Sequence, residues 1–438
     1  MEKSRKRFIV IPLVVGLLLM FIIFPQPRLA AQTDPIRRNG FIFAQYNSPM
    51  VDTEPASYLT VILKTGYTSD PEGKAGLTDL TNELFYYLLK NSSAIDIQYH
   101  TAAEFSFFNF TVLRSDYESF CKELDFLIRQ DALLLYDWCN RITRFHMNEP
   151  HPERLIAETN YRELIYGVSH PYLKVNHIVY RNLTITDVNN WFRLIYRPSN
   201  LILASSAKLS DEFLGRPFGR DIHTPVQFPN IPPVESKGTK RFIYAAIHDN
   251  VSTIVMGFPA PPLNQRDCIT TMLIQKYLQN KLLEEMKEKS GLCRAVEVSY
   301  SYLEELSVPT LTVTCQSLPE DCPKIVHKTI EVMKELMANG IPENEEERIL
   351  KEETQQMMVR YYSLPYAVQN LAFQTFSDQS WIGDVAIYND KLSQVSREQV
   401  KRVVTDKLPF LKISVAGPEM SDIDLKKLRS ESEKALIP

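Results

Sequence analysis

The sequence predicts an α+β protein made of two tandem homologous domains, each a mixed β-sheet with helices packed on one face. Three observations predict this fold. The chain has 438 residues, more than one hydrophobic core usually organises. The same order of strands and helices occurs twice, and a proline-rich segment without strand or helix periodicity separates the two copies.

Residues 1–38 precede the first domain and carry a targeting signal. Four basic residues lie just before a 17-residue apolar run, residues 8–24, which two prolines and small residues follow. This order is typical of a secretory signal peptide, and the run also reaches the lower length limit of a membrane span. We therefore expect an exported protein that is either periplasmic or anchored to the inner membrane by an uncleaved signal anchor.

The first domain is predicted at residues 39–215. Short apolar runs indicate strands, and apolar residues at helical spacing indicate helices. In chain order these are a strand at 58–63, a helix with Leu77, Leu80, Leu84 and Leu88, a strand at 108–113, a helix through 120–127, a helix that Thr186 caps, and a strand at 201–204.

The second domain, residues 241–421, repeats this order after the linker at 216–240, which holds five prolines. Its elements are a strand at 253–258, a helix through 269–278, a strand at 310–315, a helix through 325–333, a helix that Ser396 caps, and a strand at 411–415. The two capping residues are 210 residues apart, as are the two final strands, which indicates a duplication. We expect residues 422–438 to form a charged, frayed tail.

The composition excludes several functions. A net charge of −4, with acids and bases spread along the chain, gives no electrostatic reason to bind nucleic acid. Only 14 glycines are present, and the chain has no glycine-rich phosphate loop or G-x-S-x-G motif. The six cysteines form no C-x-x-C motif, so buried thiols and disulfides both remain open.

Three segments in the first half resemble the pitrilysin/insulinase family of zinc metallopeptidases, the inverzincins. They are Ser169-His170-Pro171-Tyr172, then residues 183–188 (LTITDV), then residues 196–201 (YRPSNL). Their order and spacing follow the family signature, and the resemblance covers roughly residues 39–420. It implies a clamshell of paired α+β domains and a zinc-dependent peptidase activity.

The zinc motif of that family, H-x-x-E-H, is degenerate in this chain. The segment Gly76-Leu77-Thr78 aligns with the residues before the motif, which places Asp79 and Glu83 at the two histidine ligands and Asn82 at the catalytic glutamate. An amide cannot take a proton from water, so the general base is missing. The region of the third ligand, 135–149, offers Arg141, Arg144 and His146 instead of the expected glutamate. We expect no cofactor and no metal, and we interpret Asp79, Asn82 and Glu83 as the polar face of an amphipathic helix.

A second family element is also degenerate. The resemblance implies an arginine and, seven residues later, a tyrosine that help bind substrate, and these positions hold Lys287 and Arg294. Lysine lacks the bidentate fork of arginine. The chain is therefore not expected to complete another subunit's active site directly. The histidines and glutamates at 146–153 suit a proline-rich turn better than a metal site.

The leading hypothesis is an exported pseudoenzyme. As a non-catalytic subunit it would form a heterodimer with an active pitrilysin-like zinc peptidase, or bind extended peptides at a sheet edge. Two alternatives stay open. One is a divergent metalloendopeptidase that uses Asp79 and Glu83 around a different cation, and the other is a structural scaffold subunit of an envelope complex.

Overall fold

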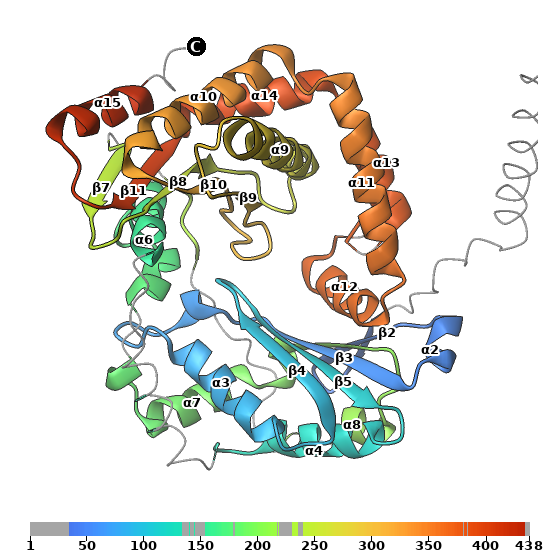
Figure 1. Ribbon diagram of the computed structural model, residues 1–438. Helices are drawn as coiled ribbons and strands as arrows, with labels where there is room; N and C mark the ends of the chain where they lie inside the picture. Colours follow the sequence, from blue (N-terminus) through green and yellow to red (C-terminus); the bar gives the residue numbers. More distant parts are fainter. Residues whose placement is uncertain are drawn as a thin grey trace, which may run out of the picture.

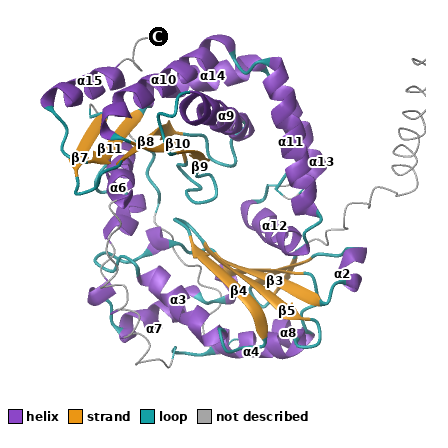
Figure 2. Ribbon diagram, viewed as in Figure 1, coloured by secondary structure: helices purple, strands orange, loops and turns teal. Residues whose placement is uncertain are grey.

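The computed structural model describes residues 35–133, 140, 144, 154–177, 180–216, 218, 230–234, 240–379, 381–382 and 384–433. Its two sheets lie one above the other, and most helices lie on the outer sides of the pair (Figures 1 and 2). Residues 1–34 of the predicted signal segment and most of the predicted linker lie outside the described residues. None of the described helices is long and apolar enough to cross a membrane.

The first sheet has the strand order β1-β2-β6-β3-β5-β4. Its strands are β1 (Ile36–Arg38), β2 (Phe41–Gln45), β3 (Ala56–Leu63), β4 (Ala94–Thr101), β5 (Ser106–Leu113) and β6 (Leu201–Ser205). All neighbouring pairs are antiparallel except β2 and β6. A mixed sheet was predicted, and it is confirmed.

Helices of the first half cover one face of this sheet. They are α3 (Leu77–Leu89), α4 (Tyr117–Arg129), α7 (Ile185–Ile195) and α8 (Asp211–Gly215), while the short α2 (Pro49–Thr53) lies at the sheet margin. Alternate strand residues, among them Leu59, Val61 and Phe108, join the leucines of α3 in one buried cluster. This alternation is what a sheet packed on helices requires.

The second sheet has the order β7-β11-β8-β10-β9 and the same mixed character. Its strands are β7 (Phe242–Ala246), β8 (Ser252–Pro259), β9 (Ala295–Tyr300), β10 (Thr310–Ser317) and β11 (Lys412–Gly417). The helices of this half are α9 (Asp267–Leu282), which continues as a π-helix (Leu283–Lys289), α10 (Cys322–Asn339), α11 (Glu343–Tyr361), α12 (Leu364–Ser377), α13 (Val385–Ser393), α14 (Arg397–Lys407) and α15 (Asp422–Glu433).

The second face of each sheet is covered by a helix from the other half. Helix α6 (Arg154–Tyr166) belongs to the first half by sequence but packs on β7, β8 and β11 of the second sheet. Helix α12 packs in return on β2, β3 and β6 of the first sheet. Figure 1 shows both helices between the sheets. Each sheet thus has its own helices on one face, as predicted, and an exchanged helix on the other, which was not predicted.

Two local predictions were wrong. The cap of α7 is Thr184, whose side chain and that of Asp187 form a reciprocal capping box, so the distance to the equivalent Ser396 is 212 residues and not 210. Residues 422–433 of the predicted frayed tail form α15, which buries Leu428 against α10. Five of the six cysteines are described, and all five are buried free thiols.

Candidate functional site

Helix α3 carries the degenerate motif, and a buried carboxylate fixes its first turn. The two carboxylate oxygens of Asp70 accept hydrogen bonds from the backbone N–H of Gly76 (2.7 Å) and of Thr78 (2.8 Å). Gly76 adopts a left-handed conformation (φ 90°), which glycine tolerates without strain. Acceptors at a helix N-terminus satisfy otherwise unpaired amides. The turn before Asp79 is therefore rigidly held.

Asn82 is fully buried and has two hydrogen-bonded partners. Its Nδ2 donates to Thr101 Oγ1 at the end of β4 (3.0 Å), and its Oδ1 accepts from Tyr196 Oη (2.9 Å). Glu83 is buried as well, at 8% exposure. The polar face predicted for this helix is therefore not turned to solvent at Asn82 and Glu83, which lie against β4 and α7 inside the first half.

Tyrosine side chains surround the two carboxylates of the motif. Tyr180 Oη donates to Asp79 Oδ2 (2.9 Å). Burial, together with the negative charges of Glu83 and Asp79, raises the pKa of Tyr99 far above its usual value, and burial and Asp79 do the same to the pKa of Tyr180. Both phenols therefore stay protonated and can donate hydrogen bonds. Sequence reasoning missed them, since neither stands at a motif position.

This donor set does not fit zinc. The two motif positions supply oxygen ligands where Zn²⁺ favours nitrogen and sulfur, and one oxygen of Asp79 is already engaged by a phenol. Among the described residues, no group of three or more His, Cys, Asp or Glu side chains could hold a metal ion. Arg141 and His146, in the region of the missing third ligand, lie outside the described residues, and Arg144 is exposed.

Lys287 and Arg294, at the degenerate arginine and tyrosine positions, are exposed at the end of the π-helix and just before β9. Neither side chain hydrogen-bonds to another residue in the part of the chain that the structure describes. The contact between the two hairpins, at Ala103 and Glu304, is made beyond the other end of β9. The structure therefore does not bring Lys287 and Arg294 together with Asp79.

Each sheet has a hairpin strand at one of its two edges, β4 in the first sheet and β9 in the second, and these two edges differ in one respect. In each hairpin, residue pairs that are hydrogen-bonded to each other alternate with pairs that are not. The N–H and C=O groups of Ile97 and Tyr99 on β4 therefore point away from the sheet. The same groups of Val296 and Val298 on β9 do so as well. Among the described residues, no side chain hydrogen-bonds to the backbone of Ile97 or Tyr99. The edge of β4 is open in this sense.

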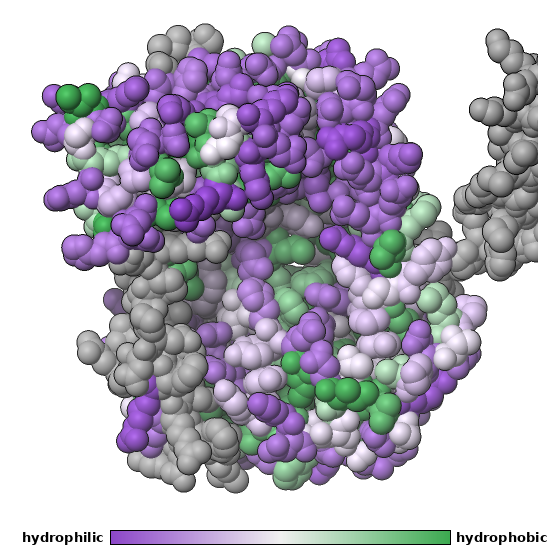
Figure 3. Space-filling view, in the orientation of Figure 1, coloured by the Kyte–Doolittle hydropathy of each residue, from purple (hydrophilic) through white to green (hydrophobic). Residues whose placement is uncertain are grey.

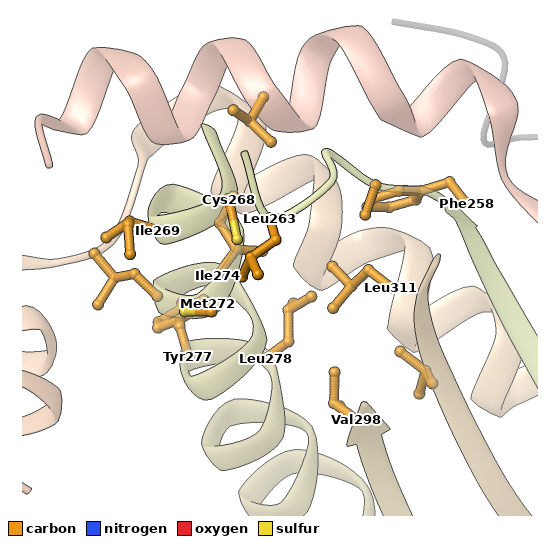
Figure 4. Packing of buried hydrophobic residues seen from close by; sticks show 14 of the residues in the cluster. Phe258, Leu263, Cys268, Ile269, Met272, Ile274, Tyr277, Leu278, Val298 and Leu311 are labelled. Carbon is orange, nitrogen blue, oxygen red and sulfur yellow. The ribbon is translucent and has the colours of Figure 1, made fainter. Parts of the chain in front are cut away.

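Two glutamines of α9 occupy the edge of β9. Gln279 Oε1 accepts from Val298 N (2.7 Å), Gln279 Nε2 donates to Val296 O (3.3 Å), and Gln275 Nε2 donates to Val298 O (2.6 Å). Figure 4 shows the side chain of Val298 beside α9, near Leu278. The amides bond to β9 as a neighbouring strand would, and such cover protects an exposed sheet edge from pairing.

The turns of the two hairpins meet across the halves. Ala103 N donates to Glu304 O (3.0 Å), and His100 Nε2 lies 2.6 Å from Glu304 Oε2. Figure 3 shows the surface hollowed between the halves, with hydrophobic residues inside the hollow. The open edge of β4 thus ends at a contact with the second half.

The ion pair between His100 and Glu304 should respond to pH. The hydrogen bond to Glu304 raises the pKa of His100, although partial burial opposes this. The contribution of the pair to stability is therefore complete below the unfolded-state pKa near 6.5 and is lost as pH rises through the higher folded value. We expect Glu304→Gln to lower the pKa of His100 measured by NMR titration. An unchanged pKa in this variant would contradict the assignment.

The fold agrees with comparisons to known proteins. Residues 182–353 match the family model described as peptidase M16 inactive domain. The crystal structure of a peptidase M16 inactive domain from Pseudomonas fluorescens superposes with a TM-score of 0.74 at 15% identity, over 89% of this chain and 99% of that chain. The family model and the shared fold support a member of the pitrilysin family. The resemblance inferred from the sequence is confirmed.

Other solved structures with the pitrilysin fold differ in assembly. The periplasmic protease PqqL from Escherichia coli matches with a TM-score of 0.67 at 14% identity, over 90% of this chain but 47% of that chain. A chain of complex III2 from Candida albicans matches with a TM-score of 0.66 at 13% identity, over 92% and 99% of the two chains. At these identities the likeness concerns the fold. No curated protein matches the sequence.

Proposed function

We propose that this pitrilysin-family protein is a non-catalytic subunit that holds extended peptides along β4 and pairs with an active zinc peptidase subunit in the cell envelope. The open edge of β4 is the observation that carries the proposal. It lies beside the degenerate motif, where Asn82 replaces the general base and is held by two structural hydrogen bonds.

Backbone pairing suits this edge. A peptide that adds a strand to a sheet gains its affinity from main-chain hydrogen bonds, and β4 offers the outward groups of Ile97 and Tyr99 for them. The glutamines of α9 leave no such opening at Val298. Of the two hairpin edges, β4 on the first half is therefore the one open to a peptide.

Two further observations support pairing and export. The chain spans about half of PqqL, so one chain of this length corresponds in fold to half of that protease. The basic residues and apolar run of the N-terminal segment have the pattern of an export signal. A pull-down should accordingly recover a partner chain that carries an intact H-x-x-E-H motif. Assembly into an envelope complex that holds no peptidase would favour the scaffold alternative.

Ile97→Pro tests the peptide site, because proline removes the outward N–H while an edge position tolerates its ring. The matched control is Ile97→Ala, which also removes the isoleucine side chain but keeps the N–H. The probe is a short fluorescein-labelled peptide of alternating valine and threonine that ends in phenylalanine. One lost hydrogen bond of about 1 kcal/mol corresponds to roughly fivefold weaker binding in fluorescence anisotropy.

The result that overturns the peptide site is equal affinity of the proline and alanine variants, or no binding of the peptide to the wild type. The double variant Gln275→Ala with Gln279→Ala is a second test of peptide binding at a sheet edge. It should uncover β9 and raise the peptide stoichiometry from one to two per chain.

A further inference from the structure

A cavity of about 330 Å³ lies in the second half, between α9, β9 and helices α11 to α13. Aromatic side chains make up much of its wall, namely Tyr300, Tyr302, Tyr366, Phe373, Trp381 and Tyr388. Met272, Val298 and Met357 add apolar surface. The cavity can therefore enclose one aromatic or large apolar side chain.

Its charged groups leave a surplus of positive charge. Lys276 Nζ forms an ion pair with the buried carboxylate of Glu353 (2.9 Å), to which Tyr388 Oη also donates (3.4 Å). Arg360 lines the same cavity with its guanidinium over the ring of Tyr366, 5.7 Å from the ring centre. Within the described part of the chain, no carboxylate lies at ion-pair distance from Arg360. The arginine is thus available to an anionic ligand.

We propose that this cavity binds a ligand that has a free carboxylate next to an aromatic or apolar group. Arg360 binds the carboxylate, since a guanidinium presents two parallel N–H donors to it. The aromatic side chains of the wall pack against the aromatic or apolar group of the ligand. Two sources share this chemistry, a small aromatic acid and the C-terminal residue of a peptide. The peptide source rests on the proposed function of β4.

The position of the cavity fits the peptide source. Tyr302 and Leu303 line it, and the next residue, Glu304, contacts His100 on β4. A peptide paired with β4 therefore reaches the cavity at the Thr101 end of that strand. Its C-terminus arrives there only if the peptide runs parallel to β4.

The experiment compares ligands with and without the carboxylate. The chain has three tryptophans, and Trp381 lies in the cavity wall, so ligand entry can be followed by tryptophan fluorescence with Trp381→Phe as the blank. N-acetylphenylalanine should bind about 10- to 100-fold more tightly than its amide, as for a hydrogen bond to a charged group. The same ratio should hold for the valine-threonine peptide with a free or an amidated C-terminal phenylalanine.

Arg360→Gln should abolish the preference for the free acid. The matched control is Arg348→Gln on the same helix, because Arg348 is exposed and pairs with Glu345 and Glu352 away from the cavity. Equal affinity for acids and amides in the wild type, or an unchanged preference in Arg360→Gln, overturns the proposal. If N-acetylphenylalanine binds more tightly than its amide but the two peptide forms do not differ, the cavity is a site for small acids and not for a peptide C-terminus. If both peptide forms bind with equal affinity, β4 remains a peptide site, but the cavity does not bind the peptide C-terminus.

Discussion

Replacing Glu305 by alanine should lower the free energy of unfolding by about 3–5 kcal/mol. Glu305 is 2% exposed, and its Oε1 lies 2.7 Å from Nη1 of Arg162. Its Oε2 accepts from Tyr166 Oη (2.5 Å) and Ser301 Oγ (2.8 Å). The arginine and the tyrosine belong to α6, whereas Glu305 follows β9. Alanine would leave the guanidinium of Arg162 without its counter-charge at the contact between the halves.

In urea unfolding followed by circular dichroism, Glu305→Ala should unfold at a lower midpoint urea concentration than the wild type. The matched control is Glu118→Ala, which breaks the exposed ion pair with Lys122 on α4 and should leave the midpoint almost unchanged, because solvent screens exposed ion pairs. The double variant Arg162→Met with Glu305→Leu should recover much of the loss, because it removes both charges. A Glu305→Ala midpoint equal to that of Glu118→Ala would show that the buried pair does not join the halves.

Gly257→Ala should cause the second largest decrease in the free energy of unfolding. Gly257 lies on β8 where α6 crosses the second sheet, and a methyl group there would meet Leu311 O at 2.1 Å and Tyr161 Oη at 2.6 Å. The first contact is with backbone and cannot be relieved by a rotamer change. Overpacking of this kind costs about 1–3 kcal/mol or more, and we expect the upper end because both neighbours are fixed.

The same urea experiment measures the effect, with Glu297→Ala as the control. Residue 297 lies in the same sheet with its side chain exposed, so a change there should stay within about 0.5 kcal/mol. Tyr161→Phe in the Gly257→Ala background should relieve only the contact with the hydroxyl. Wild-type stability of Gly257→Ala would mean that α6 does not press against β8 as closely as the structure shows.

Local pattern was enough to predict three strands and three helices of each half, but it did not predict the hairpin edge strands β4 and β9 or helices α11 to α13. The apolar run at residues 58–63 and the leucine spacing from Leu77 to Leu88 predicted β3 and α3, because these residues pack within their own half. The cap of α7 was misplaced by two residues because Thr184 and Thr186 both precede acceptable helical sequence. Only Thr184 makes the reciprocal bonds with Asp187.

The surroundings of the degenerate motif could not be predicted from spacing. A helical repeat tells which residues share a face, but the partners Thr101, Tyr180 and Tyr196 come from distant segments. The same holds for α6 and α12. Their sequences show apolar faces but not which sheet each face covers, so the exchange between the halves was missed.

The exchange of α6 and α12 also sets the order in which the chain can fold. The first sheet has all its strands once residue 205 is present, yet Phe105 and Phe107 lack their ring partner Phe373 until α12 has been synthesised. Contacts between residues this far apart in the chain close late and slowly. The first half therefore cannot reach its native state ahead of the second. The newly made molecule stays unfinished, with apolar sheet surface uncovered, until almost its whole length is available.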